Sequence, residues 1–213
     1  MCGRYLILSS PEAFRRLFGY REQPSFPPRY NVIVNARAES VNDKPAFCYA
    51  MRRRRCLFPA DGFYEWKDDA GRKRAFCVRP KDRAPVAFAG LWETWMGPHG
   101  EELETAAIVT AAANRDLATL HPRMPVIIPA EAFDFWLDCR SVDAMTATSL
   151  LDAAPNGLLE AYEISPAVNR TANDGPELIA PVAPTAAAEP SAPVRRKPAG
   201  SRDERQPSLF DDW

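Results

Sequence analysis

Apolar residues in the middle of the chain occur in short runs, some alternating with polar residues, and turn-forming residues separate the runs. Short aromatic and β-branched segments bounded by Gly, Pro, Asn or Asp are typical of β-strands. The pattern predicts strands at 46–51, 55–59, 74–80, 85–95, 105–113 and, as a strand and turn, 159–169. The loops DDAGRK (68–73) and MGPHGEE (96–102) are expected to close hairpins.

Three further stretches carry apolar residues at helical spacing. Residues 9–19 predict a short helix that ends at Gly19, because glycine tolerates the backbone conformation that follows a helix. Residues 129–138 predict an amphipathic helix, and 142–154 predict one more. The inward side chains of the amphipathic helix are expected to be Phe133, Trp136 and Leu137.

The composition changes near residue 180, so we expect one domain over 1–180 and an appended tail. Residues 181–205 are rich in Ala, Pro and charge, which is typical of a disordered linker. Residues 206–213, QPSLFDDW, bring apolar side chains back at Leu209 and Phe210. Because such side chains have no core to join there, the last segment is interpreted as a docking peptide.

The overall composition is globular. The chain has 213 residues, of which 46% are hydrophobic, and shows neither a membrane-length apolar run nor a signal-peptide pattern, so we expect a soluble, cytoplasmic protein. Its five cysteines form no CxxC pair and it has only two histidines, so we expect reduced thiols, no metal and no cofactor.

The net charge of −1 hides an uneven distribution. Residues 1–83 hold eighteen Lys/Arg against nine Asp/Glu, whereas 84–213 hold nine against nineteen. This asymmetry predicts one positive face, which suits phosphate groups. The densest run, Arg52–Arg55, is either a solvated hairpin edge or a nucleic-acid contact.

Cys2 follows the initiator methionine directly, and its small side chain permits removal of Met1. The new terminus would carry an α-amine with a pKa of about 7.7–8.0 next to a nucleophilic thiol. Together these groups can condense with an aldehyde, first to a Schiff base and then to a thiazolidine ring. The simpler alternative is that Cys2 is a small buried residue at the start of a strand.

Several polar residues are spaced to share a strand face. Arg4 follows Cys2 by two positions, and Asn35, Arg37 and Glu39 follow one another at the same period. Taken singly, each could cap a turn or bind a backbone carbonyl.

Glu65 and His121 are the remaining candidates for chemistry. Glu65 lies in the aromatic segment GFYEW, where desolvation would raise the pKa of its carboxyl, as general acid–base work requires. His121 is the histidine with an ordered, apolar context. Glu65 could instead pair with an arginine, and His121 could be a core residue with satisfied hydrogen bonds. Together with Cys2, an amide and arginines, they suit chemistry on a phosphate-bearing aldehyde.

At this point the motifs MCGRY, NARAES, RRCLFPADGFYEWK, AFAGLWE, HPRMPVII and ISPAVN resemble, in order, those of the SRAP family of SOS-response-associated peptidases, or abasic-site-processing proteins. The resemblance covers roughly residues 1–180. It implies an α+β fold: a single domain with a curved, barrel-like, mainly antiparallel β core and a few peripheral helices.

The resemblance also implies a function, namely covalent capture of abasic sites in single-stranded DNA through a thiazolidine, with lyase and peptidase side activities. The catalytic residues implied are Cys2, Asn35, Glu65 and His121. The DNA-binding residues expected from the resemblance and the charge pattern are Arg4, Arg37, Trp66 and Arg123. A monomer, associated with the nucleoid when on DNA, is expected.

The sequence departs from the family pattern near residues 31–35, where the RYN motif runs straight into NARAES. The family normally places a segment with base-stacking tryptophans between these motifs. Stacking is worth about 1–3 kcal/mol per base, so its loss predicts weaker DNA binding and a partly open barrel. Either Trp66, Phe63 or Tyr64 partly substitutes for it, or the protein is a crippled variant of the family.

The tail carries a second resemblance. Gln206, Leu209 and Phe210 in QPSLF match the short peptide by which bacterial DNA enzymes dock on the replication sliding clamp. A glutamine amide orients such a peptide and a Leu-Phe pair fills an apolar pocket.

Two other functions stay open. A non-catalytic single-strand binder or clamp-associated adaptor would bind DNA in a salt-dependent way that does not depend on Cys2. A peptidase or hydrolase with Cys2 as N-terminal nucleophile would act on peptides and ignore aldehydes.

Overall fold

A computed structural model describes residues 4–9, 11–19, 34–96, 99–100, 102–170 and 172–182. The chain divides into two units, Met1–Val182 and Ala183–Trp213, and all described residues belong to the first. Among them, no helix is both long enough and apolar enough to cross a membrane. Pro181 and Val182, the first residues of the predicted linker, still pair with the strand that ends at Ile164.

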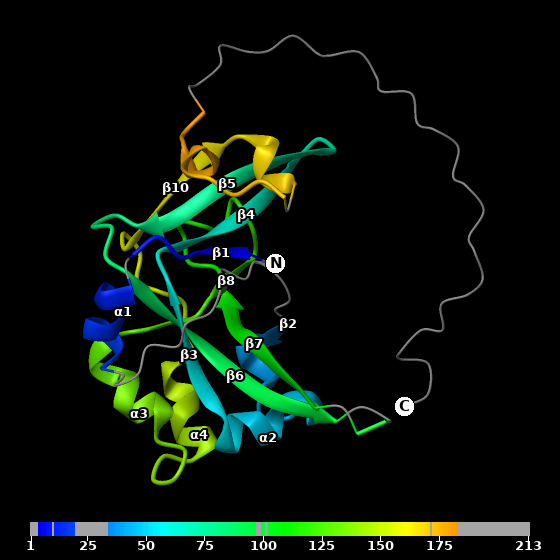
Figure 1. Ribbon diagram of the computed structural model, residues 1–213, viewed down its shortest axis with the longest axis vertical. Helices are drawn as coiled ribbons and strands as arrows, with labels where there is room; N and C mark the ends of the chain where they lie inside the picture. Colours follow the sequence, from blue (N-terminus) through cyan, green and yellow to red (C-terminus); the bar gives the residue numbers. More distant parts are fainter. Residues whose placement is uncertain are drawn as a thin grey trace, which may run out of the picture. The chain divides into compact units, whose positions relative to one another are not determined.

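Two β-sheets build the domain (Figure 1). Sheet A is four-stranded and antiparallel, in the order β1-β4-β5-β10. Its strands are β1 (Arg4–Leu6), β4 (Gly62–Asp69), β5 (Arg72–Pro80) and β10 (Leu159–Ile164).

Sheet B is six-stranded. Its main path is β2-β7-β6-β3, with β8 added to β7 and β9 added to β6. The pair β2–β7 is parallel and the other pairs are antiparallel. Its strands are β2 (Val34–Arg37), β3 (Arg55–Ala60), β6 (Val86–Met96), β7 (Glu102–Ala112), β8 (Arg123–Pro125) and β9 (Ile127–Ile128).

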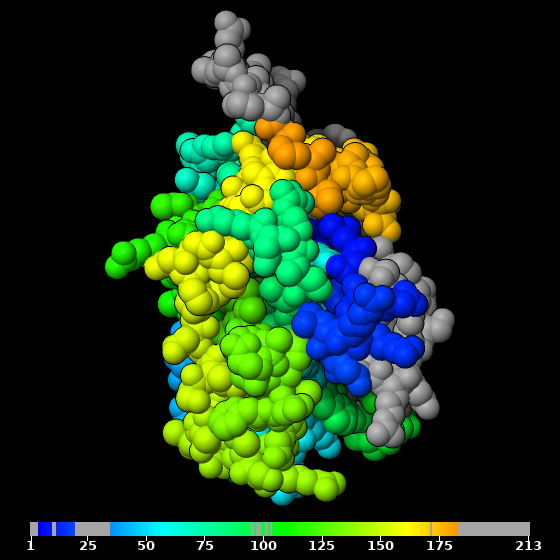
Figure 2. Space-filling view, turned by 90° about the vertical axis from the view of Figure 1, so that its left-hand side faces the viewer, coloured from blue at the N-terminus to red at the C-terminus, as the bar shows by residue number. Residues whose placement is uncertain are grey.

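Helices cover the side of sheet B that faces away from sheet A. The α-helices are α1 (Pro11–Phe18), α2 (Pro45–Arg53), α3 (Phe133–Leu137) and α4 (Ala144–Ala147). Figure 2 shows α1 beside α3, where the Phe18 and Phe133 rings stack with centroids 5.1 Å apart. Short 3-10 turns are η1 (Ala38–Ser40), η2 (Ala130–Ala132), η3 (Thr148–Leu150), η4 (Pro166–Asn169) and η5 (Pro176–Ile179).

The strand pleat separates two apolar cores. Alternate residues of sheet B, such as Ala89 and Leu91, pack against the helices. The residues between them, such as Phe88, meet Phe63 and Val78 of sheet A. We call these the helix face and the inner face of sheet B. The α+β class with a mainly antiparallel β core is confirmed.

Both predicted hairpins are confirmed. The β4–β5 hairpin turns at Ala70 and Gly71, which both have positive φ, as a two-residue turn between twisted strands requires. The β6–β7 hairpin pairs Met96 with Glu102. The predicted helix at 9–19 is also confirmed as α1, and Gly19 after it has φ +65°.

The predicted strand at 46–51 is wrong, because these residues lie in helix α2. Pro45 occupies the first turn, where its missing N–H costs nothing. Phe47, Ala50 and Met51 then face the core at helical spacing.

Two helix predictions are only partly right. The helix predicted over 129–138 begins later, because Ala130–Ala132 forms the 3-10 turn η2 and α3 spans Phe133–Leu137. Leu137 is 44% exposed, not inward, while Phe133 and Trp136 of the same short helix are buried. The single helix predicted over 142–154 is instead α4 followed by η3, which ends at Leu150.

The Arg52–Arg55 run is not a solvated edge throughout. Arg55 is 4% exposed, and its guanidinium donates to backbone oxygens of Met51, Trp136, Asp138 and Val142 at 2.6–2.9 Å. Because a buried charge needs such partners, Arg55 joins α2 to the segment around α3. Arg55 is therefore a packing residue and not a surface cation.

Candidate active site

The pleat of β4 decides which of its side chains reach the space between the sheets. Phe63 packs in the core between the sheets, whereas Tyr64 and Trp66 pack on the outer face of sheet A. Since side chains alternate along a strand, Glu65 points inward with Phe63. Glu65 is 3% exposed, so a carboxylate lies buried between the two sheets.

Asn35 approaches the same space from sheet B. It lies on β2 opposite Ile108 of β7, and its neighbour Ala36 is buried on the helix face. By alternation, Asn35 and Arg37 both lie on the inner face. The predicted strand face is therefore confirmed for this pair, and it is wrong for Glu39, which lies in η1.

His121 lies next to Glu65. The structure places its Nδ1 3.8 Å from Oε2 of Glu65, which is ion-pair distance when the imidazole is protonated. The other carboxylate oxygen, Oε1, accepts a hydrogen bond from the backbone N–H of Trp66 at 3.1 Å. One oxygen is thus held by the strand and the other faces the imidazole.

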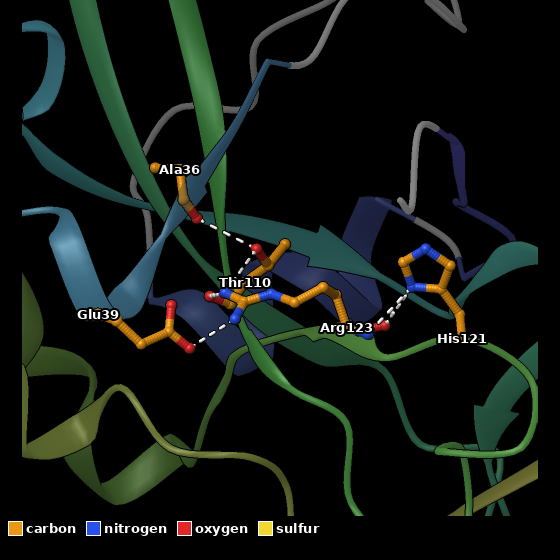
Figure 3. A network of polar contacts seen from close by, with 5 residues as sticks. All are labelled: Ala36, Glu39, Thr110, His121 and Arg123. Carbon is orange, nitrogen blue, oxygen red and sulfur yellow. Dashed lines mark hydrogen bonds and ion pairs between the residues drawn. The ribbon is translucent and has the colours of Figure 1, made fainter.

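The His121 ring is oriented by the turn that leads into β8. Nδ1 lies 3.0 Å from the backbone nitrogen of Arg123 and 3.1 Å from its backbone oxygen, as Figure 3 shows. In one tautomer Nδ1 accepts from the N–H, and in the other it donates to the oxygen. In both tautomers the Arg123 backbone orients the imidazole.

A polar network in Figure 3 holds Arg123 in turn. Its guanidinium donates to the Glu39 carboxylate and to the backbone oxygen and Oγ1 of Thr110. Thr110 Oγ1 then donates to the backbone oxygen of Ala36 at 3.2 Å. The hydrogen bond from Arg123, and the charges of Arg123 and Arg37, hold the pKa of Glu39 below its usual value. The network ties η1, β2, β7 and β8 together behind His121.

Arg4 and Trp66 lie apart from this inner group. Arg4 is opposite Tyr64 in the β1–β4 ladder, so its side chain lies on the outer face of sheet A. Its guanidinium lies 5.7 Å from the Trp66 ring centroid and donates to the backbone oxygen of Val168. The Trp66 Nε1–H donates to Asn169 at 2.8 Å. Of the eight residues predicted for catalysis and DNA binding, the structure brings together Asn35, Arg37, Glu65, His121 and Arg123.

Cys2 lies outside the described residues, as do the RYN motif at 29–31 and the predicted docking residues Gln206, Leu209 and Phe210. Among the described cysteines, burial raises the pKa of Cys56 to about 12 and also raises that of Cys77. Both therefore stay protonated at neutral pH and are poor nucleophiles.

Sequence reasoning missed Thr110 and the pairing of Glu39 with Arg123. One signal was available for Thr110, since it is the single polar residue within the apolar run AAIVTAA. Its contact with Arg123 depends on the pairing of β7 with β8, which no local pattern reveals.

The fold and the site define a class: a small α+β domain with a carboxylate, an imidazole and an amide enclosed between two sheets. The sequence model of the family described as SOS response associated peptidase (SRAP) matches residues 32–171. The chain belongs to this family, and Cys2 precedes the matched range.

Proteins of several organisms are similar to this chain. Abasic site processing protein YoqW of Bacillus subtilis (strain 168) is 40% identical over 148 residues, which cover 69% of this chain and 66% of that protein. Abasic site processing protein HMCES of Rattus norvegicus is 30% identical over 186 residues, covering 74% and 52% respectively. The chain thus spans just under two thirds of the first relative's length and about half of the second's.

Solved structures agree with the fold. A crystal structure of a protein from Bacteroides thetaiotaomicron has a TM-score of 0.65 and 28% identity, covering 70% of this chain and 66% of that one. A protein from Bordetella bronchiseptica reaches a TM-score of 0.66 at 23% identity, covering 77% of this chain and 100% of its own.

Proposed function

We propose that this protein recognises abasic sites in single-stranded DNA and bonds to them covalently through Cys2 after loss of Met1. The observation that carries the proposal is the pair of buried Glu65 and half-buried His121, 3.8 Å apart, on the inner side of the sheets with Asn35. The similarity to proteins named abasic site processing proteins supports the choice of substrate.

The first chemical step is opening of the sugar ring. An abasic deoxyribose exists as a cyclic hemiacetal in equilibrium with an open aldehyde. Opening needs a proton removed from the C1′ hydroxyl and one delivered to the ring oxygen. Glu65 and His121 supply an acid and a base side by side, a pairing worth roughly 10²–10⁴-fold in rate.

The second step builds the covalent bond. The Cys2 amine attacks C1′ and water leaves, which gives a Schiff base. The Cys2 thiolate then adds to the same carbon while the nitrogen takes up a proton, which closes a thiazolidine. One water is released overall and no oxidant is needed. Asn35 is proposed to hold the amine by a hydrogen bond.

Two side activities follow from the same groups. The Schiff base can lose the 3′ phosphate by β-elimination, which is lyase chemistry. The family description includes the word peptidase. Removal of Met1 is the simplest peptidase reaction that would free the Cys2 amine, and ordinary methionine removal would also suffice.

DNA contacts are proposed at Arg37, Arg4, Trp66 and Arg123, which would bind phosphates or stack on bases. Arg37 is exposed next to Asn35 on β2, which favours a contact near the lesion. Arg123 already binds Glu39, so a phosphate there would compete with that carboxylate. We further infer that the protein acts as a monomer in the cytoplasm, at the nucleoid when on DNA, because single-strand binding requires no second copy.

The QPSLF segment is proposed as a tether to the replication sliding clamp, by its match to a Q-x-S-L-F peptide. A peptide of residues 200–213 should bind purified clamp in fluorescence anisotropy, and the same peptide carrying Leu209→Ala and Phe210→Ala should not. Equal binding of both would refute the tether.

The test of the main proposal is a crosslinking assay. Purified protein, with Met1 loss confirmed by mass, is mixed with single-stranded DNA carrying one abasic site and run on a denaturing gel. We expect a heat-stable band that Cys2→Ser abolishes and that undamaged DNA does not give. Borohydride added early should trap the Schiff base, while the finished thiazolidine resists it.

The same assay distinguishes the proposed function from the two alternatives, a non-catalytic DNA binder and a hydrolase. Tight, salt-dependent DNA binding without a band, unchanged by Cys2→Ser, would identify a non-catalytic binder. Cys2-dependent cleavage of peptides without reaction at the aldehyde would identify an N-terminal-cysteine hydrolase.

A further inference from the structure

The inner face of sheet B extends beyond the part that sheet A covers. Figure 1 shows β6 and β7 running on past β4 and β5 towards α2. In this extension Trp92 of β6 lies opposite Ala106 of β7. Leu91 packs on the helix face, so the Trp92 ring lies on the inner face by alternation. Trp92 is 38% exposed, so part of this large apolar side chain is open to solvent.

Arg54 accompanies this ring. Its guanidinium lies 5.2 Å from the ring centroid, within the range of a cation–π contact. The backbone N–H of Trp92 donates to the backbone oxygen of Arg54 at 3.0 Å, so the two residues are fixed side by side. Arg54 also forms an ion pair with Glu93. The pair of side chains therefore offers an aromatic surface and a cation that a stronger anion could take from Glu93.

The strand register relates this pair to the candidate active site. Ile108 of β7 lies between Asn35 and Gly90, and Ala106 with Trp92 forms the next inward-facing row. With strands about 4.8 Å apart and about 3.3 Å per residue, the Cα atoms of Trp92 and Asn35 are roughly 12 Å apart. Arg37 lies one row to the other side of Asn35. Asn35 thus lies between two rows that each carry an arginine, Arg54 beside Trp92 on one side and Arg37 on the other.

We propose that Trp92 and Arg54 form a subsite for a nucleotide that flanks the reacting one: its base stacks on Trp92 and its phosphate binds Arg54 in place of Glu93. The inference rests on the proposed function and extends its DNA-binding surface. Glu104, opposite Thr94 in the following row, is a carboxylate that would repel a further phosphate, so the subsite ends at Trp92.

The proposed subsite would also replace the base-stacking segment that the family pattern leads us to expect near residues 31–35. A stacking platform is provided by a different strand, on the same face as Asn35 and in line with it. Of the three substitutes expected from sequence, Tyr64 and Trp66 lie on the outer face of sheet A and Phe63 is buried in the core between the sheets.

The experiment measures equilibrium binding by fluorescence anisotropy. The probe is a single-stranded oligonucleotide with a central tetrahydrofuran, an abasic analogue that cannot react. Trp92→Thr, which suits a strand, should weaken binding about 5- to 150-fold, the stacking value of one base. Trp92→Phe, which keeps a ring, should bind within a few-fold of wild type.

The matched control is Tyr49→Ala. Tyr49 is 62% exposed and carries Arg53 at 5.8 Å, so it forms the same kind of aromatic–arginine pair, but on helix α2. This variant should bind like wild type. Arg54→Gln should flatten the plot of log Kd against log salt by about 0.7, the slope of one phosphate contact on a single strand. Glu93→Gln should tighten binding.

A second oligonucleotide identifies the stacking partner. When the nucleotides beside the tetrahydrofuran also lack bases, the effect of Trp92→Thr should disappear. Wild-type binding that is unchanged by Trp92→Thr, by Arg54→Gln and by flanking bases overturns the subsite and leaves the proposed function intact. A wild-type protein that crosslinks no abasic DNA and binds none overturns both.

Discussion

The two faces of sheet B give arginine side chains different burial and different partners. On the helix face, Arg55 is enclosed and gives its hydrogen bonds to backbone oxygens of its own chain. On the inner face, its neighbour Arg54 is about one third exposed, and it contacts an aromatic ring and a carboxylate. The sequence neighbours Arg54 and Arg55 are chemically identical, but Arg54 caps the end of α2 whereas Arg55 begins β3, so their side chains meet different surroundings.

The same division recurs along β2 and β7. Ala36 and Val109 are buried against the helices, while their neighbours Asn35 and Thr110 lie on the inner face, where Thr110 contacts Arg123 (Figure 3). Side chains on the helix face should therefore matter for folding, and polar side chains on the inner face should matter for chemistry and binding. Each prediction below tests one side of this contrast.

The largest effect is expected for Arg55→Ala. It leaves backbone oxygens of Met51, Trp136, Asp138 and Val142 without their donor in a buried place. We expect a loss of about 3–5 kcal/mol in the free energy of unfolding, measured by urea denaturation. Arg52→Ala, at an exposed position, should cost at most about 0.5 kcal/mol. Equal effects of the two variants would remove the contrast between the faces.

Glu65→Gln should slow the reaction and leave the stability of the fold nearly unchanged. The amide keeps the shape of the side chain but cannot take up a proton, so the rate of crosslinking should fall by about 10²-fold, roughly 2.7 kcal/mol of barrier. The urea midpoint should move little. A variant that crosslinks at the wild-type rate would show that the Glu65–His121 pair plays no part in the reaction.

Gly90→Ala tests the apolar part of the inner face. A Cβ at Gly90 would lie 2.8 Å from Cys56 Sγ and closer still to the Phe58 ring. Overpacking of this kind costs about 1–3 kcal/mol of stability. Adding Phe58→Leu should restore part of the loss in the same urea experiment. No recovery would mean that the strain lies elsewhere.

The smallest effect concerns Glu39. Its pKa is lowered by the Arg123 hydrogen bond, so its ionised form stabilises the fold above the unfolded pKa of about 4.3. That contribution is lost as pH falls through the lower folded value. Because the side chain is 56% exposed, wild type and Glu39→Gln should differ by at most about 0.5 kcal/mol at pH 6 and converge near pH 3. A gap that widens towards pH 3 would contradict the assigned sign.

Strands β3, β5, β6, β7 and β10 and both hairpins could be predicted because alternation and turn residues are local signals. Strands β4, β8 and β9 were not predicted. The segment 46–51 could not, since its aromatic residues suit a strand while its apolar spacing suits a helix. The fixed position of the α3 end was also hidden. Arg55, far away in sequence, donates to the backbone oxygens of Trp136 and Asp138 there, and only tertiary contact reveals that.

Part of the candidate site could likewise be predicted from the sequence, and part could not. Period-two spacing placed Asn35 beside Arg37, and the family resemblance pointed to Glu65 and His121. The 3.8 Å separation of Glu65 and His121 depends on how the two sheets pack, which spacing does not encode. Arg4 and Trp66 were expected in the same site as the inner residues. The pleat of β1 and β4 turns both side chains outward instead.

Arg55 also has a consequence for biogenesis. Its most distant acceptor, Val142, lies 87 residues downstream. At a synthesis rate of about 5–20 residues per second, the ribosome needs roughly 4–17 s to make that acceptor after Arg55 has been added. Throughout this interval the set of acceptors stays incomplete, because only Met51 precedes Arg55 in the chain. The speed of translation between codons 56 and 142 therefore sets how long the Arg55 charge lacks part of its native hydrogen bonding.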